Sequence, residues 1–199
     1  MVVNYMEKIE FLTPRWDEIY DQLIILAEKI LASNYNPHYI VGIARGGWIT
    51  ARIMSDLLSN PNTGNVRCEL YESFGEMKER ASITQPVSID ITDKLILLCD
   101  DVADSGGSFI AVTEHLRSKN PKEIRSAAIH RKPQSKFSPD YFVEETSKWI
   151  IYPWELRETI NDMIEKFHVK FNSRQLSKRM NIEKKFIDKF LEWDKKYRR

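Results

Sequence analysis

The sequence has little cysteine and no long apolar run. Its 199 residues include two cysteines, Cys68 and Cys99, too few for a disulfide framework or a cysteine-ligated metal cluster. Both fall in predicted strands, where we expect unpaired core thiols. No run approaches the length of a membrane span, and residues 1–10 lack the apolar segment of a secretion signal. We therefore expect a cytoplasmic protein with no membrane partner.

The chain also lacks a strong charge of either sign. Its 30 basic and 29 acidic residues give a net charge of +1, and 42% of its residues are hydrophobic. That composition is typical of a folded protein and is sufficient for one core domain plus an appendage. No internal repeat or low-complexity segment is present, which argues against repeat architectures and intrinsic disorder.

Apolar periodicity and Asn/Pro/Gly breakers predict an alternation of helices and strands. A first helix starts at Thr13-Pro14 and continues to about residue 33. The predicted elements that follow are strand 39–43, helix 48–59, strands 66–71 and 95–99, helix 108–119 and strand 124–129. This order is typical of a doubly wound α/β core with a parallel sheet.

The most informative stretch begins with the apolar run Leu95–Cys99. It ends in two acids, Asp100 and Asp101, and opens into the Gly/Ser-rich turn Asp104–Ser108. Backbone N–H groups in such a turn, at the start of a helix, suit a phosphate, whereas the carboxylates suit hydroxyl groups and a divalent cation. The stretch predicts a ligand that carries a phosphate, a diol and a metal. The plain alternative is a strand–turn–helix unit with Asp104 as the helix cap.

A second strand–glycine–helix unit occupies residues 39–58. Its turn contains Arg45, Gly46 and Gly47. Glycine allows backbone N–H groups to approach an anion closely, and the arginine adds positive charge. Because the carboxyl ends of parallel strands share one edge of the sheet, we expect this turn to face residues 100–108.

Residues 95–108 resemble the phosphoribosyl pyrophosphate (PRPP) motif of type I phosphoribosyltransferases. Serine stands at positions 105 and 108, where the commonest form of the motif has threonine. The resemblance implies the type I phosphoribosyltransferase fold, a parallel sheet flanked by helices, with a small hood and a C-terminal three-helix unit. We expect a core over residues 1–130, a hood over 131–155 and a helical extension over 156–199.

The resemblance also implies roles for individual residues. The 5′-phosphate would be bound by Asp104, Ser105, Gly106, Gly107 and Ser108. The ribose hydroxyls would contact Asp100 and Asp101, with Mg²⁺ near Asp101. Pyrophosphate would be bound by Ala44, Arg45, Gly46, Lys78 and Arg80, and Arg45 would also act in catalysis as a cation. Asp104 would approach the purine N7 as a general base.

Lys78 and Arg80 fall in residues 72–86, which the sequence predicts to be a long loop of the kind that closes over PRPP. The alternative is that both are solvated loop charges.

The residues that contact the purine base and select it are expected to follow residue 130. Lys132-Pro133 and the segment 149–155 are similar to the hood of xanthine and hypoxanthine-guanine phosphoribosyltransferases. In that family Trp149 would stack on the purine, the backbone of Ile150 would read its edge, and Lys132 would donate to the exocyclic oxygen. Adenine carries an amino group there, so Lys132 by itself favours a 6-oxopurine. Trp149 would alternatively pack a small β subdomain.

Three helical patterns follow residue 155, and this layout resembles archaeal-type adenine phosphoribosyltransferases. On that ground the sequence predicts transfer of the phosphoribosyl group to adenine, giving AMP and pyrophosphate. The alternative is a hypoxanthine, guanine or xanthine enzyme. The expected partners are PRPP, a purine base, a nucleoside monophosphate, pyrophosphate and a second copy of the chain in a homodimer.

A further alternative is a PRPP-sensing transcriptional regulator. Residues 173–182 followed by 185–193 fit a helix-turn-helix pattern, and the tail is basic. The complete set Arg45, Asp100, Asp101 and Asp104 favours an enzyme instead, and we expect no nucleic-acid partner.

Overall fold

The computed structural model describes residues 9–72, 79–166 and 172–197. Within them, a six-stranded sheet has the order β4-β3-β2-β5-β6-β7, and β1 and β8 form a separate pair. The strands of the larger sheet are β2 (Tyr39–Ala44), β3 (Thr63–Glu72), β4 (Glu79–Gln85), β5 (Leu95–Ala103), β6 (Glu123–Arg131) and β7 (Tyr141–Glu145). All neighbouring pairs in it are parallel except β3 and β4.

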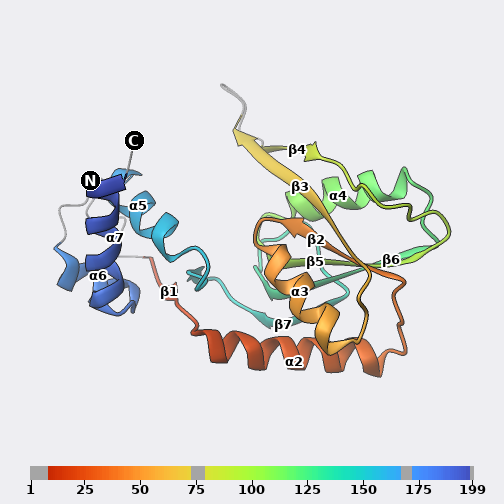
Figure 1. Ribbon diagram of the computed structural model, residues 1–199, viewed down its shortest axis with the longest axis horizontal. Coiled ribbons are helices and arrows are strands. Elements are labelled where there is room, and N and C mark those ends of the chain that lie inside the picture. Colours follow the sequence, from red (N-terminus) through yellow and green to blue (C-terminus); the bar gives the residue numbers. More distant parts are fainter. Residues whose placement is uncertain (1–8, 73–78, 167–171, 198–199) are drawn as a thin grey trace. The chain divides into compact units, whose positions relative to one another are not determined.

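Helices cover both faces of this sheet. Helix α3 (Gly47–Leu57) follows β2, and α4 (Gly107–Arg117) follows β5. Figure 1 shows α4 on one face and α2 (Trp16–Ala32) with α3 on the other. Apolar side chains of β2, β5 and α4 are buried together in one core, as expected for strands covered on both faces. The predicted α/β architecture is confirmed.

Strand β5 is longer than the sequence predicts. Its residues Ile96–Cys99 are fully buried, but pairing with β6 continues through Ala103. Asp100 and Asp101 therefore lie inside the last part of a strand, and the loop begins only at Asp104. The prediction that the strand ends at residue 99 was wrong because the pairing partner, and not the apolar run, determines where the strand ends.

The segment predicted as one long loop, residues 72–86, contains strand β4. It runs antiparallel to β3, with Leu70 opposite Ala81. Ile83 packs against the core, while the rest of the strand is poor in apolar residues. An edge strand of this kind carries a weak sequence signal because it is stabilised by pairing with its neighbour.

The chain forms two compact units, one of which comprises Ile19–Ser147 and contains the larger sheet. The other joins the residues up to Glu18 to those from Lys148 onward. The predicted hood, residues 131–155, is divided between them, since β7 is an edge strand of the larger sheet, whereas β8 (Trp149–Ile150) pairs with β1 (Phe11–Leu12). The three predicted segments stay a prediction.

The second unit has its own core. Its helices are α5 (Leu156–Lys166), α6 (Ser173–Met180) and α7 (Lys184–Tyr197), as the tail pattern predicts. Their buried apolar residues include Ile160, Met163, Leu176, Met180 and Ile187. No helix among the described residues is long and apolar enough to cross a bilayer.

Candidate active site

Two adjacent carboxylates lie at the carboxyl end of β5. Asp100 and Asp101 are both buried, and the backbone N–H of Asp101 donates to Asp100 Oδ1 over 3.0 Å. The N–H of Val102 donates to Asp101 Oδ1 over 2.8 Å. Burial, together with the neighbouring Asp101 carboxylate, raises the pKa of Asp100 well above its usual range. Such a pair suits a ligand that brings positive charge or hydroxyl donors.

The turn after β5 is shaped around glycine. Gly106 has φ of +85°, in the left-handed region that glycine adopts without strain. A Cβ on it would lie 2.6 Å from the backbone nitrogen of Phe137. The N–H of Gly107 donates to Ser105 Oγ over 3.3 Å, and α4 begins at Gly107 without a side-chain cap. The uncapped helix N-terminus fits the expected phosphate site.

The turn after β2 contacts the acidic pair directly. A Cβ on Gly46 would overlap the Asp101 carboxylate, so only glycine leaves room for it at this position. The peptide bond between Ala44 and Arg45 is cis. Ala44 is buried at the end of β2, while Arg45 is exposed. The predicted convergence of residues 44–47 with Asp100 and Asp101 is therefore present.

Residues 132–137 hold the phosphate turn in place, a role that the sequence analysis missed. The N–H of Lys132 donates to the carbonyl oxygen of Ala103 over 3.0 Å, and that of Lys136 to Ser105 over 3.1 Å. The Phe137 ring stacks on Phe109 in the first turn of α4, with ring centroids 4.9 Å apart. The Lys132-Pro133 pair after β6 indicates a turn. No pattern in the neighbouring sequence indicates that this turn contacts the phosphate turn.

Lys132 is buried beside this turn. Burial lowers the pKa of its ammonium group, and the nearby Asp104 carboxylate opposes that shift. The Lys132 side chain is thus turned inward, within electrostatic range of Asp104, and only 6% of the residue is exposed.

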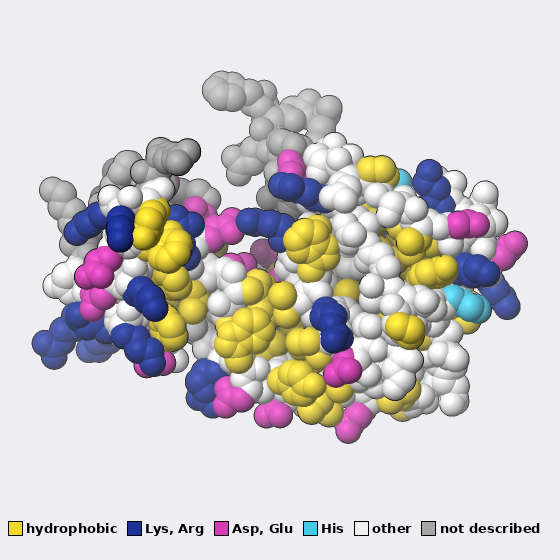
Figure 2. Space-filling model, in the orientation of Figure 1, with side chains coloured by type: hydrophobic (Ala, Val, Ile, Leu, Met, Phe, Trp, Pro, Cys, Tyr) yellow, Lys and Arg dark blue, Asp and Glu magenta, His cyan; other side chains and the backbone are white. Residues whose placement is uncertain are grey.

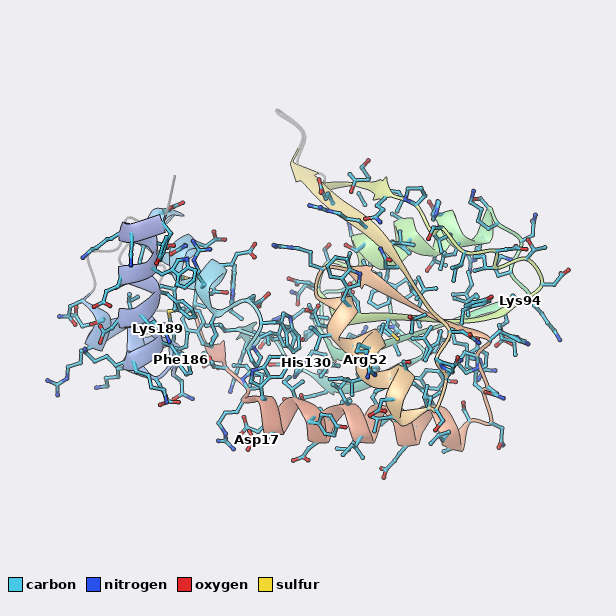
Figure 3. All side chains as sticks on the ribbon, in the orientation of Figure 1. Asp17, Arg52, Lys94, His130, Phe186 and Lys189 are labelled. Carbon is cyan, nitrogen blue, oxygen red and sulfur yellow. The ribbon has the colours of Figure 1, made fainter. Side chains whose placement is uncertain are left out.

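His130, two residues before Lys132, is fully buried on β6. The Gln22 amide nitrogen lies 3.4 Å from His130 Nε2 and donates to Glu144 Oε2 over 3.3 Å. Burial, together with Lys132, lowers the pKa of His130 to about 4. The imidazole is therefore neutral near pH 7 and serves as an uncharged link between α2 and β6 (Figure 3).

Cys68 on β3 reaches the far end of the phosphate turn, where its thiol hydrogen-bonds with Ser108. Burial raises the pKa of this thiol. Cys68 and Cys99 are both free thiols, as the sequence predicts.

A pocket of about 190 Å³ is lined by residues 100–109. A larger one of about 460 Å³ lies against residues 36–39, 58–62 and Lys94, which is labelled in Figure 3. Its lining contains no carboxylate. The smaller pocket carries the acids and the helix N-terminus and is the better candidate for the active site.

The arrangement within the sheet unit does not test four of the predicted residues. Trp149 and Ile150 form β8 in the other compact unit, with Trp149 opposite Phe11 and Ile150 opposite Leu12. Lys78 lies outside the described residues, and so does the side chain of Arg80, whose backbone pairs with Tyr71. Their roles stay predictions.

Comparison with known proteins identifies the family. The family model described as "Phosphoribosyl transferase domain" matches residues 15–159, which include both turns and the acidic pair. The chain belongs to the phosphoribosyl transferase family. As a member it is a transferase enzyme, and the residues from α6 onward lie beyond the matched part.

Named relatives of this phosphoribosyltransferase support the assignment. A xanthine-guanine phosphoribosyltransferase of Gluconobacter oxydans is 25% identical over 75% of this chain and 87% of its own length. One from Cereibacter sphaeroides is 28% identical over 71% and 84%. The solved purine phosphoribosyltransferase of Pyrococcus horikoshii is 33% identical, with a TM-score of 0.66 over 73% of this chain and 94% of that one.

Proposed function

We propose that the protein transfers the 5-phosphoribosyl group of PRPP to a 6-oxopurine, namely hypoxanthine, guanine or xanthine, and releases pyrophosphate. The proposal of a 6-oxopurine, in place of adenine, rests on the burial of the Lys132 side chain beside Asp104. The adenine prediction rested on the helical tail and required Lys132 to turn away or to contact another group. The structure instead buries Lys132, and the relatives from Gluconobacter oxydans and Cereibacter sphaeroides are named xanthine-guanine phosphoribosyltransferases. The adenine prediction is therefore not supported.

The phosphate turn supports PRPP as the donor. In this proposal the N–H groups of residues 105–108 bind the 5′-phosphate at the N-terminus of α4. The carboxylates of Asp100 and Asp101 accept hydrogen bonds from the ribose hydroxyls. The Ala44–Gly46 turn, with the Arg45 guanidinium, binds the pyrophosphate group beside them.

The acidic pair also fits Mg²⁺. No group of three or more potential metal-ligating side chains occurs among the described residues, but Mg²⁺ commonly uses one or two carboxylates together with substrate oxygens and water. Asp101, with Asp100 next to it, supplies these. When bound, the ion would neutralise charge on the departing pyrophosphate.

The chemistry that we propose for the residues is positioning and proton handling. A purine ring nitrogen forms a bond to ribose C1 as the bond from C1 to the pyrophosphate oxygen breaks, and the purine loses a proton. Asp104 is exposed at the mouth of the turn and is placed to exchange that proton at N7. Arg45 stabilises the leaving group, and the Lys132 ammonium donates to the exocyclic oxygen of the base.

Replacing Lys132 tests the base assignment. Lys132→Met keeps the length of the side chain and removes its donor, so kcat/KM for guanine should fall by about 100-fold, as expected when a buried charged donor is lost. The KM for PRPP should change little. Lys136→Met, an exposed side chain four residues later whose backbone contact is kept, is the matched control. A wild-type enzyme that uses adenine alone, or a Lys132→Met variant with unchanged guanine activity, contradicts the proposal.

The regulator alternative is less well supported. Helices α6 and α7 are separated by residues 181–183, and Asn181 adopts a left-handed conformation, which fits a helix-turn-helix. Yet a protein that only senses PRPP has no need of the buried lysine, Lys132, to which we assign a contact with the base. Salt-sensitive binding to duplex DNA without pyrophosphate release would favour the regulator.

A further inference from the structure

A second pocket of the sheet unit lies at the amino ends of its strands, away from the acidic pair. Residues 36–39, 58–62 and Lys94 line this pocket of about 460 Å³, which we call the amino-end pocket. Strand β2 runs from Tyr39, in the pocket wall, to Ala44 beside the acidic pair. Five steps along a strand place these two residues about 17 Å apart. In Figure 1 the arrowhead of β2 points away from the end of the sheet at which Figure 3 labels Lys94.

Hydrogen bonds hold the walls of the amino-end pocket in place. The Asn60 amide group donates to the carbonyl oxygen of Pro37 over 2.6 Å, and Asn60 Oδ1 accepts the N–H of Asn62 over 3.0 Å. Ser55 Oγ donates to the carbonyl oxygen of Asn60 over 2.6 Å. Asn60 thereby joins the end of α3, the segment before β2 and the start of β3. Because these walls are fixed in advance, a ligand would bind with little further ordering of the protein.

His38 forms the wall of the pocket that adjoins β5. Its backbone N–H donates to the carbonyl oxygen of Leu95 over 2.8 Å, and its Nδ1 accepts the N–H of Leu95 over 2.9 Å. Because Nδ1 accepts a hydrogen bond, the ring proton lies on Nε2. The exposed His38 ring therefore offers a donor, and not an acceptor, to a ligand.

Lys94 supplies the positive charge of the pocket. Its ammonium group makes no hydrogen bond or ion pair with any other residue that the structure describes. Asp90 is within electrostatic range of Lys94, but the Asp90 carboxylate accepts the N–H of Thr92 over 2.9 Å. None of the described residues that line the pocket is acidic. Figure 2 shows basic and histidine side chains next to one another at the end of the sheet unit where Figure 3 labels Lys94.

Three neutral polar side chains complete the donor set. Those of Asn36, Ser59 and Asn62 line the pocket and make no hydrogen bond with the other described residues. Their amide and hydroxyl groups are available to a ligand, together with the Lys94 ammonium and His38 Nε2. A lining in which donors and a cation occur without a carboxylate suits a phosphate group, whose oxygens accept hydrogen bonds.

The pocket is larger than a phosphate group requires. Its volume lies in the range of sites for small organic ligands. The lining also includes Pro37, Leu58 and Pro61, and the aromatic residue Tyr39. Apolar and aromatic side chains of this kind pack against flat rings. A ligand that combines a phosphate, a polar sugar and a flat ring is a nucleotide.

We infer that the amino-end pocket binds a 5′-nucleotide, with the phosphate toward Lys94 and His38 and the base against the apolar side chains. This second site is separate from the phosphate turn at residues 105–108. A purine phosphoribosyltransferase releases a nucleoside monophosphate, so its own reaction produces a ligand of the required class. The inference goes beyond the proposed function and does not depend on which purine the enzyme uses.

Calorimetric titration of GMP into the full chain, saturated with PRPP and Mg²⁺ in the absence of a base, tests the second site. PRPP then occupies the phosphate turn, so any GMP that binds does so elsewhere. We expect one saturable GMP site per chain. Guanosine, which lacks the phosphate, should bind at least about tenfold more weakly because the charge-assisted hydrogen bonds are lost. No GMP binding, or guanosine binding as tight as that of GMP, overturns the inference.

Substitutions in the pocket lining locate the site. Asn36→Asp with Asn62→Asp keeps the shape of both side chains and adds two negative charges, whereas Lys94→Met removes the positive charge. Either variant should raise the Kd for GMP at least about tenfold. Lys122→Met is the matched control, since Lys122 is exposed, lies outside the lining and contacts Lys94 only through its backbone N–H. Circular dichroism checks folding. GMP binding that neither pocket variant weakens overturns the inference.

A titration with PRPP alone separates this result from the test of the proposed function. A chain that binds no PRPP contradicts the proposed donor. GMP is then titrated without PRPP, and GMP binding that is weakened by Lys94→Met still supports the second site. A chain that binds PRPP but no GMP keeps the proposed donor and contradicts the second site.

Discussion

The two compact units of this phosphoribosyltransferase use charge in opposite ways. In the sheet unit, the charged groups Asp100, Asp101 and Lys132 are buried at the carboxyl ends of β5 and β6. In the helical unit, apolar residues are buried, and the charges of α7 lie largely at the surface. Burying a charge is costly unless it is compensated, so a fold retains it where a ligand or a reaction needs it. The buried charges of the sheet unit are those to which we assign the PRPP and base contacts in the proposed function.

The largest effect on activity is expected from a substitution in the sheet unit, at Asp104. Asp104→Asn keeps the hydrogen-bonding shape and removes the proton acceptor, so kcat should fall by about 100-fold or more, with the KM for PRPP changing less than about threefold. Steady-state rates with guanine and PRPP check this. Asp56→Asn, an exposed change on α3, is the matched control. Equal, small losses in both parameters would remove Asp104 from the proton-transfer step.

A core substitution in the helical unit should affect stability but not chemistry. Leu176 is 1% exposed in the core of that unit, and Leu176→Ala should lower the free energy of unfolding by about 3 kcal/mol. The KM values should stay unchanged where the variant is folded. Urea unfolding and steady-state kinetics measure the two effects. Lys178→Ala, on the same helix and exposed, should change stability by less than about 0.5 kcal/mol. A changed KM for guanine in the folded variant would contradict the prediction that Leu176 contributes to stability and not to substrate binding.

A backbone change in the phosphate turn should affect PRPP binding more than turnover. In Gly106→Ala the new Cβ meets the Phe137 backbone, and alanine is strained at a φ of +85°. The turn must shift, so the KM for PRPP should rise at least about tenfold, whereas the KM for guanine should rise less. In the control Gly64→Ala, the Cβ crowds the flexible end of the Ile89 side chain and is in ordinary contact with Val41. An unchanged KM for PRPP in Gly106→Ala would show that this turn does not bind the phosphate.

The buried imidazole of the sheet unit predicts a pH dependence of stability. The pKa of His130 is about 4 in the folded protein, against an ordinary value of 6.5, so below pH 6.5 the unfolded chain binds a proton that the folded chain does not. The contribution of His130 to the free energy of unfolding is therefore fully present above pH 6.5, and it is lost as the pH falls toward 4. Between pH 7.5 and 5.5 the loss should be about 1.4 kcal/mol.

Urea midpoints at the two pH values measure this loss, and His130→Gln should remove most of the pH dependence. His115, whose pKa is also lowered by burial, contributes in the same direction. If His130→Gln keeps the full pH dependence of the wild type, groups other than His130 cause the loss of stability.

The sequence predicts those parts of the fold and of the site that are determined by residues close together in the chain. The two strand–glycine–helix units and the three C-terminal helices are local patterns of apolar spacing and turn residues. From them the convergence of Gly46 with Asp101 follows, because parallel strands end at one edge.

Other features depend on partners far away in the chain. Among the described side chains of strand β4, Ile83 is partly buried against the core, and the strand is defined by its pairing with β3. The contacts of Lys132, Lys136 and Phe137 with the phosphate turn join segments about thirty residues apart in sequence. The burial of Lys132, on which the proposed preference for 6-oxopurines rests, is likewise a tertiary property. The adenine prediction, which is not supported, rested on the helical tail, most of which lies beyond the residues that the family model matches.

The most direct test is the initial rate of pyrophosphate release by the wild-type enzyme from PRPP and Mg²⁺, with guanine, hypoxanthine, xanthine or adenine, and without a base. We predict release that depends on at least one 6-oxopurine and is about 100-fold slower with adenine, because the Lys132 donor would face the adenine amino group. Release with adenine alone, or no release with any base, would contradict the account.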